Sequence, residues 1–239
     1  MALPVLRAQS DDQAVDEAIG KIGTQHYAEA LQILRPLAAK GSARAEFNLG
    51  MLYQKGLGVA KDDVAALAWF RKAAAQGLAL AQYDVGWMYG NGAGVGHDDA
   101  EALAWYRKAA AQGLADAEYS LGLALTNGVG VKADDKEAVE WLRKAAEQDH
   151  GEAQGMLAAL YCDGLGTAKD LIEGYKWFAL SAGQQVAGAK EAMAALETVL
   201  TPEQIETAKN AAAEWRKAHP SKTTIIDLGD PIKPGDLPQ

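Results

Sequence analysis

The chain has 239 residues and a single cysteine, Cys162, so it can form a sizeable core but no internal disulfide. Alanine and glycine dominate and strand-forming residues are sparse, which favours helices packed through small residues over a β-sheet. The formal net charge of −9 argues against a nucleic-acid partner, and no apolar run reaches the ~18 residues that a membrane span requires.

The N-terminal segment allows two interpretations. Residues 1–10 contain a short apolar piece that ends in Ala8 and is followed by polar residues. This pattern is typical of the end of a secretory signal peptide, and the alternative is a disordered N-terminus of a cytoplasmic protein. The signal interpretation, which we favour, predicts a periplasmic or secreted location.

A segment that follows only part of the later repeat comes next. Residues 11–44 are predicted to form an N-terminal capping pair, with one helix at about 11–20 and a second at 27–41. The second helix matches the second helix of the repeat, with Ile33 in place of its tryptophan. The first helix lacks the long glycine loop that follows it in the repeat, as expected of a cap.

A repeat of 36 residues occupies the middle of the chain. We place its four copies at residues 45–80, 81–116, 117–152 and 153–184. Four tryptophans mark the register without a gap: Trp69, Trp105, Trp141 and Trp177. A repeated segment usually means a structural unit that buries its apolar face against its own copies.

Each copy predicts two helices and a loop. Helix A carries Ala45, Leu49 and Tyr53 at helical spacing and ends at a Gly-x-Gly loop. An aspartate then caps helix B in every copy: Asp62, Asp98, Asp134 and Asp170. Three copies add a glutamate three residues later, which predicts a capping box: Glu101, Glu137 and Glu173. Two helices per 36 residues predict an all-α, right-handed α-solenoid, or superhelix, of antiparallel helix pairs.

The C-terminal part is predicted to close the array. Residues 185–219 hold two capping helices, and the second begins with Thr201 as N-cap, Pro202 in the first turn and Gln204 completing a capping box. The chain then has about twelve helices in all. Residues 220–239 contain four of the seven prolines and predict an extended tail.

The repeat pattern resembles the Sel-one-like repeat (SLR) family. The matching motif is A-x-x-x-L-G-x-x-Y-x-x-G-x-G-V, an aspartate, and then A-x-x-W-(F/Y)-x-K-A-A-x-x-G, over residues 45 to about 184. The resemblance implies an α-solenoid that assembles protein complexes, and many bacterial members are exported. Some cysteine-rich relatives are credited with β-lactam hydrolysis or binding, but this chain lacks their repeated cysteine pairs.

The concave groove of such an array, lined by the A helices, is the predicted binding surface. Its predicted residues are Phe47, Met51, Gln54, Tyr83, Trp87, Tyr119, Leu123 and Thr126. The matching positions of the fourth copy are small, at Gly155, Ala159 and Cys162, so a partner is expected nearer the N-terminal half. Trp87 stands out because no other copy has a tryptophan there. The alternative is that the repeated aromatic residues pack between neighbouring A helices.

Other chemistry is poorly supported by the sequence. The Asp-Asp pairs lack the glycine and distal glutamate of a calcium loop, and the four histidines show no zinc spacing. His150 lies in the turn before the predicted helix that carries Cys162, and this helix places the two residues more than one turn apart, which is unsuitable for a nucleophile and its base. We therefore predict no catalytic residue, no metal and no cofactor.

The sequence as a whole predicts a non-enzymatic adaptor or scaffold that binds a protein or an extended peptide in its groove. One alternative is that the tail, 220–239, lies in its own groove as an autoinhibitor or in a neighbour's groove as a dimer contact. A second alternative, less supported, is a hydrolase such as a β-lactam-directed enzyme.

Overall fold

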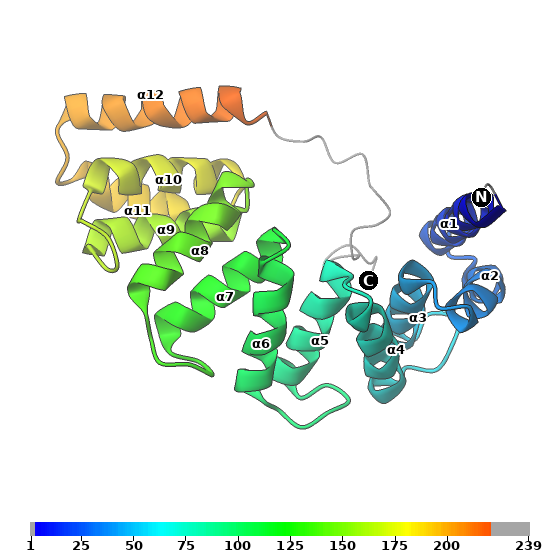
Figure 1. The fold of residues 1–239 in the computed structure, drawn as a ribbon. Coiled ribbons are helices and arrows are strands. Elements are labelled where there is room, and N and C mark those ends of the chain that lie inside the picture. The colour runs from blue at the N-terminus through cyan, green and yellow to red at the C-terminus, as the bar shows by residue number, and fades with distance from the viewer. Residues whose placement is uncertain (1–2, 221–239) are drawn as a thin grey trace. The chain divides into compact units, whose positions relative to one another are not determined.

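The structure, a computed structural model, describes residues 3–220 of the chain. Residues 1–2 and 221–239 lie outside the described range, and with them nearly all of the predicted proline-rich tail. Between residues 3 and 220 the chain forms twelve α-helices and no strand (Figure 1). The prediction of an all-α repeat solenoid is confirmed.

The helices belong to two compact units, whose described residues are 3–105 and 106–220. Unit 1 holds α1 (Leu3–Gly23), α2 (Tyr27–Ala39), α3 (Ala43–Lys55), α4 (Asp63–Ala75) and α5 (Ala79–Asn91). The division falls inside α6 (Asp99–Ala110). Unit 2 holds α7 (Ala115–Asn127), α8 (Asp135–Glu147), α9 (Gly151–Asp163), α10 (Leu171–Gly183), α11 (Ala189–Glu197) and α12 (Pro202–Ala218). The A helices are α3, α5, α7 and α9, and the B helices are α4, α6, α8 and α10.

Each unit has its own apolar core, formed by the stripes that the sequence predicts. In unit 1, Phe70 of α4 is fully buried against α3 and α5. In unit 2, Leu142 of α8 and Leu157 of α9 are fully buried in one cluster that continues to Trp177 of α10. Consecutive helix pairs therefore bury their apolar faces against one another, as a helical repeat requires.

The Gly-x-Gly loops have two separate physical requirements. The first glycine of each loop caps helix A in the left-handed conformation, with φ between 64° and 72° in the four copies. The second glycine packs against the backbone at the start of the preceding helix B: a Cβ on Gly94 would collide with Asp63, and one on Gly166 with Asp135. The loop thus joins consecutive repeats through close backbone contact.

The aspartates cap the B helices as predicted. Each accepts a backbone N–H in the first turn; for example, the Asp134 carboxylate lies 3.0 Å from the Glu137 nitrogen. The predicted capping boxes are wrong, because the glutamates bind elsewhere. Glu101 and Glu137 accept the indole N–H of Trp105 and Trp141, at 2.9 and 3.2 Å. The tryptophan one turn later is a better placed donor than the N-cap backbone.

Both ends of the array differ from the predicted bounds. Helix α1 begins at Leu3 rather than at about Asp11, since the first residues are good helix formers and a proline is tolerated in a first turn. The first of the two capping helices predicted within residues 185–219 is α11, and it covers only 189–197, because Gly188 takes a left-handed conformation with φ of 82° immediately before it.

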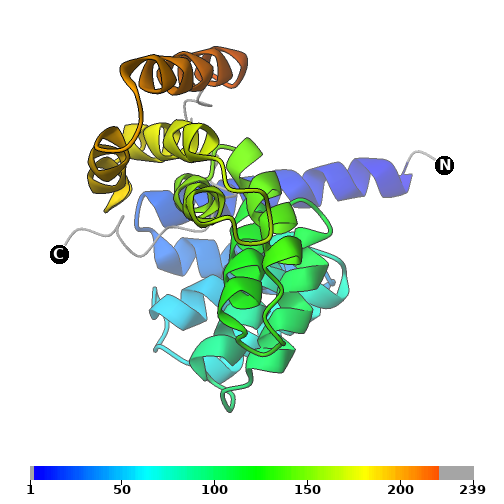
Figure 2. The same cartoon turned by 90° about the vertical axis from the view of Figure 1, so that its left-hand side faces the viewer.

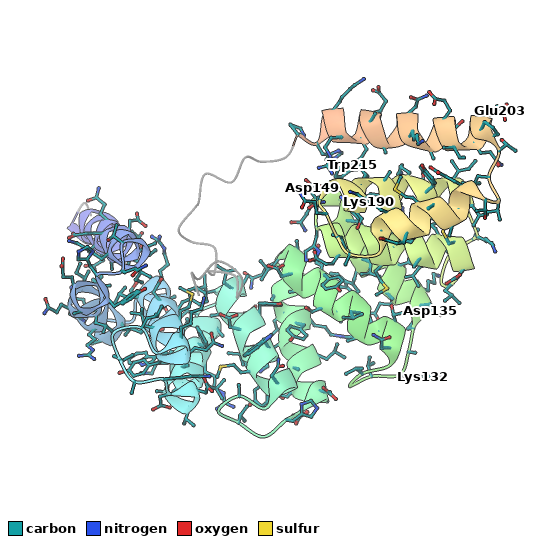
Figure 3. All side chains as sticks on the ribbon, turned by 180° about the vertical axis from the view of Figure 1, so that it is seen from behind. Lys132, Asp135, Asp149, Lys190, Glu203 and Trp215 are labelled. Carbon is teal, nitrogen blue, oxygen red and sulfur yellow. The ribbon has the colours of Figure 1, made fainter. Side chains whose placement is uncertain are left out.

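Helix α12 covers the C-terminal end of unit 2. Its predicted capping box is confirmed, with Thr201 and Gln204 exchanging hydrogen bonds. The helix lies along α10 (Figures 1 and 2), where Trp215 meets Trp177 edge to face at 5.8 Å. Its last turn is held by Arg216, whose Nη1 lies 2.6 Å from Oδ2 of Asp149; Figure 3 shows Asp149 and Trp215 at this end of α12.

Candidate functional site

Trp87 is the exposed aromatic residue that the sequence analysis placed on the A-helix surface of unit 1. Helix α5 buries Val85 and Met88 completely, so its opposite side carries Trp87 outwards with 40% of its surface exposed. The side chain of Asn91 donates to the Trp87 carbonyl at 2.8 Å. Tyr83, one turn earlier on α5, is half-buried.

Phe47 and Met51, by contrast, do not lie on an open surface. They are 3% and 8% exposed and belong to the core cluster of unit 1. The Phe47 ring contacts that of Phe70, with centroids 5.6 Å apart. The prediction that these two residues face a groove is wrong, because both are buried in the core cluster that α3 forms with α4 and α5.

The third predicted position holds Gln54, Thr126 and, in the fourth copy, Cys162, and only Cys162 has a contact that differs from the expectation. Thr126 donates its hydroxyl to Gly122 of its own helix at 3.0 Å. Cys162 packs against Gly174 of α10, so closely that a Cβ on this glycine would collide with the sulfur. In the fourth copy this position therefore faces helix B of the same pair. Gln54 is half-buried on α3.

Tyr119 of α7 contacts the next A helix through His150. The two rings stack with centroids 4.8 Å apart, and both side chains are largely shielded from solvent. His150 caps α9, because its Nδ1 accepts the Ala153 N–H at 3.2 Å, and its Nε2 lies 3.2 Å from the Asp116 carboxylate. Burial, followed by the charge of Glu152, raises the pKa of Tyr119.

The capping role of His150 was not predicted, although its position before the fourth helix A, where Ser42 caps the first, was a usable signal. Leu123, one turn after Tyr119, is half-buried.

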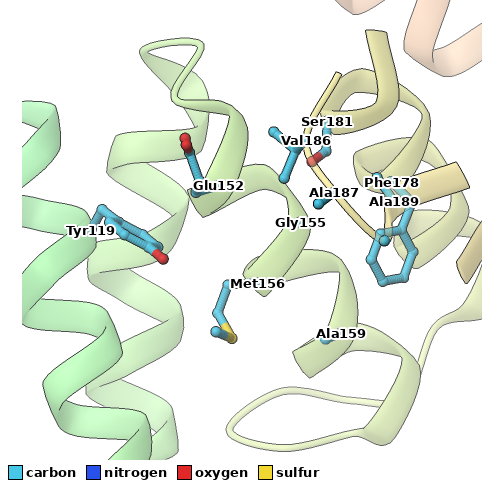
Figure 4. Close-up of a pocket in the computed structure, with 11 residues that line it drawn as sticks. Tyr119, Glu152, Gly155, Met156, Ala159, Phe178, Ser181, Val186, Ala187 and Ala189 are labelled. Carbon is cyan, nitrogen blue, oxygen red and sulfur yellow. The ribbon is translucent and has the colours of Figure 1, made fainter. Parts of the chain in front are cut away.

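Unit 2 contains a hollow of about 340 Å³ beside Tyr119 (Figure 4). Its walls come from α7, α9, α10 and the segment that leads into α11. The lining residues are Tyr119, Glu152, Gly155, Met156, Ala159, Phe178, Ser181 and residues 186–189. Tyr119 and Phe178 stand on opposite sides in Figure 4, with Met156 between them. The hollow is lined mainly by apolar atoms and includes Gly155 and Ala159 of the fourth repeat, whereas the sequence predicted a partner nearer the N-terminal half.

Cys162 and His150 lie near opposite ends of α9. Burial raises the pKa of the Cys162 thiol, which disfavours the thiolate that a nucleophilic cysteine needs. Among the residues whose side chains are described, no group of three or more histidine, cysteine or acidic residues is arranged to hold a metal ion. No helix within residues 3–220 combines the length and apolarity that crossing a membrane demands.

Comparison with known proteins gives a family and several structural relatives. The Sel1 repeat model matches residues 43–78, 79–114, 115–150 and 151–185. A Sel1 repeat protein from Oxalobacter formigenes is similar, with 32% identity, a TM-score of 0.73 and coverage of 85% of this chain and 83% of that one. Among curated proteins no match to the sequence was found.

A second similar structure is c5321, a protective antigen of uropathogenic Escherichia coli strains with an SLR fold. It shows 30% identity and a TM-score of 0.58 over 88% of this chain, which spans only 54% of the antigen. Proteins built from Sel1 repeats generally mediate protein–protein interactions and are typically non-enzymatic scaffolds. The four matched repeats and the similarity to the Oxalobacter protein lead to one conclusion: this chain belongs to the Sel1 repeat family.

Proposed function

We propose that this chain is a non-enzymatic adaptor that binds a protein partner, or an extended peptide, on the exposed surface of its A helices. The observation that carries the proposal is Trp87, which holds 40% of its surface in solvent although every other copy places a smaller residue there. Large aromatic residues at such positions are frequent anchors of protein interfaces.

The proposal is supported by what the rest of the A-helix surface offers. Tyr83 extends the Trp87 surface on α5, while Tyr119 contributes to the hollow of unit 2. The membership of the Sel1 repeat family supports a scaffold rather than an enzyme. Burial raises the pKa of the Cys162 thiol, which disfavours a role for this residue as a nucleophile.

The test is affinity capture of partners from the native host by the full chain, followed by quantitative mass spectrometry. Trp87→Ala should weaken the capture of the main partner by about thirtyfold, the change that ~2 kcal/mol at an interface anchor produces. Trp87→Ala combined with Tyr83→Ala should abolish the capture. Recovery of every partner in equal amounts by these variants would contradict the proposal.

A matched control is available in the same unit. Val64 of α4 is 66% exposed and apolar, but it lies on a B helix. Val64→Ala should leave capture unchanged, because the proposal places no partner on that surface. A loss of binding with Val64→Ala equal to the loss with Trp87→Ala would show that exposed apolar area in general, rather than the A-helix surface, controls binding.

A further inference from the structure

The hollow in unit 2 coincides with two positions where the fourth repeat departs from the other three. The first position is aromatic in the earlier copies, at Phe47, Tyr83 and Tyr119, and is Gly155 in the fourth. The second is large and apolar, at Met51, Trp87 and Leu123, and is Ala159 in the fourth. Gly155 and Ala159 both line the hollow. The hollow therefore lies where this chain itself would otherwise supply an aromatic and an apolar side chain.

The surroundings of Gly155 differ from the other repeats in a coordinated way. Ser181 replaces the alanine that the three earlier copies have, at Ala73, Ala109 and Ala145. A Cβ on Gly155 would lie 3.1 Å from the Ser181 Oγ, closer than ordinary van der Waals contact. Ser181 is fully buried and donates to the Gly151 carbonyl at 2.9 Å. This wall is thus fixed by a buried hydrogen bond and has no room for a side chain of its own.

The remaining walls suit an aromatic guest. Tyr119 and Phe178 provide rings on opposite sides, and Met156 adds a polarisable thioether between them (Figure 4). The volume of about 340 Å³ lies at the lower end of the range of small-ligand pockets. It matches one or two side chains of a peptide better than a larger cofactor.

The rim of the hollow is negatively charged. Glu152 belongs to the lining, and 61% of its side chain is exposed. The Nδ1 of His150 lies 3.5 Å from the Glu152 carboxylate, but it accepts the Ala153 N–H and so donates no hydrogen bond to Glu152 in this geometry. The chain as a whole carries a formal charge of −9. A guest with a positive charge beside its apolar group is therefore favoured.

We infer that the hollow receives an aromatic side chain of a protein partner, carried on a segment with a lysine or arginine next to it. The partner supplies the ring that Gly155 lacks, and its basic residue pairs with Glu152. This inference rests on the proposed function, because it identifies the partner chemistry of one part of the A-helix surface.

The test starts from selection of a phage-displayed random peptide library on the immobilised full chain. The selected peptides should carry phenylalanine, tyrosine or tryptophan beside lysine or arginine. A synthetic copy of the most enriched peptide is then titrated against the chain and its variants. Glu152→Gln should weaken binding about twofold to fivefold and reduce its salt dependence, because an exposed ion pair is lost.

Two variants fill the hollow in different ways. Gly155→Tyr with Ser181→Ala restores the residues that the third repeat has at these positions, Tyr119 and Ala145. Ala159→Leu restores the counterpart of Leu123 and needs no change at a glycine. Both variants should bind the peptide about tenfold or more weakly than the wild type, and both should keep the helical circular dichroism spectrum of the wild type. Ser181→Ala alone is the matched control, because it leaves the hollow open and should bind like the wild type.

Several results would overturn the inference. The first is a set of enriched peptides without an aromatic residue, and the second is no enrichment at all. The third is a selected peptide that binds the filled variants as tightly as the wild type. If Gly155→Tyr with Ser181→Ala fails to fold, the peptide affinity of Ala159→Leu provides the test. Enrichment that appears only after residues 221–239 are deleted would mean that the chain's own tail occupies the hollow. A partner that is lost with Trp87→Ala but kept by the filled variants would overturn this inference and leave the proposed function intact.

Discussion

Single residues show how one repeat position can serve different purposes. Position 46 and its equivalents alternate between glutamate and glutamine: Glu46, Gln82, Glu118 and Gln154. Glu118 is only 3% exposed, and its carboxylate accepts from the Gln148 amide at 2.7 Å. Burial raises the pKa of Glu118 more than this hydrogen bond lowers it, and the same holds for Glu46. The charged form of this carboxylate therefore costs folding free energy.

Glu118→Gln should stabilise the protein at neutral pH. Because the folded state raises the pKa, it binds more protons than the unfolded state between the two pKa values, so stability falls as pH rises through that window. Glutamine carries no charge, and the fourth repeat already pairs Gln154 with Gln184 at 2.9 Å. We expect the thermal midpoint at pH 7 to rise by about 2–3 °C, which for a chain of this size corresponds to an increase of ~1 kcal/mol in the free energy of unfolding.

The pH dependence provides the control for this prediction. The advantage of Glu118→Gln should shrink as pH falls below the ordinary range of a glutamate, where the wild-type carboxyl is protonated in both states. Glu140→Gln, at an exposed glutamate of α8, should have little effect at either pH. A Glu118→Gln variant that melts below the wild type at pH 7 would show that the Gln148 contact outweighs the cost of burial.

The repeat tryptophans show the same divergence. Trp105 and Trp141 donate their indole N–H to the glutamate four residues earlier. In the fourth repeat Lys176 binds Glu173 at 2.6 Å instead. Trp177 is 3% exposed, and its Nε1 is the buried side-chain nitrogen without a hydrogen-bond partner among the described residues. Glu173, which the sequence predicted to complete a capping box, thus pairs with Lys176, whereas its counterparts Glu101 and Glu137 bind a tryptophan.

At the level of elements, the attachment of α12 depends on an unusual turn. Asp149 has φ of 66° where the three earlier turns have glycine, at Gly41, Gly77 and Gly113. Aspartate tolerates this conformation better than most residues, but still less well than glycine. Its carboxylate accepts from Gln154, Gln184 and Arg216. Helix α12 is therefore attached to the turn between α8 and α9, at the junction of the third and fourth repeats.

Arg216→Ala should loosen α12. The pair is partly exposed, so we expect a loss of about 1–2 kcal/mol, at the lower end of the range for hydrogen bonds to charged groups. Hydrogen exchange of the α12 amides should accelerate more than that of α9. Lys217→Ala is the matched control, because Lys217 pairs with Glu214 on the exposed side of the same helix.

A double variant separates the ion pair from the backbone strain at the turn. Asp149→Gly added to Arg216→Ala should recover part of the loss, since glycine relieves the positive φ of Asp149 and leaves no unpaired carboxylate. If the double variant were less stable than Arg216→Ala alone, the contacts of Asp149 with the two glutamines would be the main attachment of α12.

At the level of the whole molecule, stability is expected to be nearly local. In unit 1 and in unit 2, each helix pair packs on its sequence neighbours, and the core clusters are separate. In such an array a partner can contact several repeats, and each repeat can diverge without loss of the fold. The fourth repeat uses this freedom at Gly155, Ala159 and Ser181.

The tail is best tested on the full chain. Under the proposed function, deletion of residues 221–239 should change neither the affinity for a captured partner nor the molar mass in solution, because the binding residues lie within the repeats. Light scattering coupled to size exclusion measures the mass, and titration measures the affinity. A higher affinity after deletion would identify the tail as an internal plug, and a change from dimer to monomer would identify it as a contact between copies.

The sequence by itself determined the repeat, its period, the helix pairs, the aspartate caps and the glycine loops. These features depend on residues close together in the chain, so their spacing is sufficient. The sequence also contained the signal for the hollow, in the small residues Gly155 and Ala159. From their positions alone, however, we predicted only that a partner binds nearer the N-terminal half.

Only the tertiary structure decided which side chains are covered. Phe47 and Met51 occupy positions equivalent to Tyr83 and Trp87, yet Phe47 and Met51 are buried in the core cluster of unit 1 whereas Trp87 is exposed. The attachment of Arg216 to Asp149 joins residues 67 positions apart. Burial and such contacts depend on how neighbouring helices pack, which a pattern within one helix does not specify.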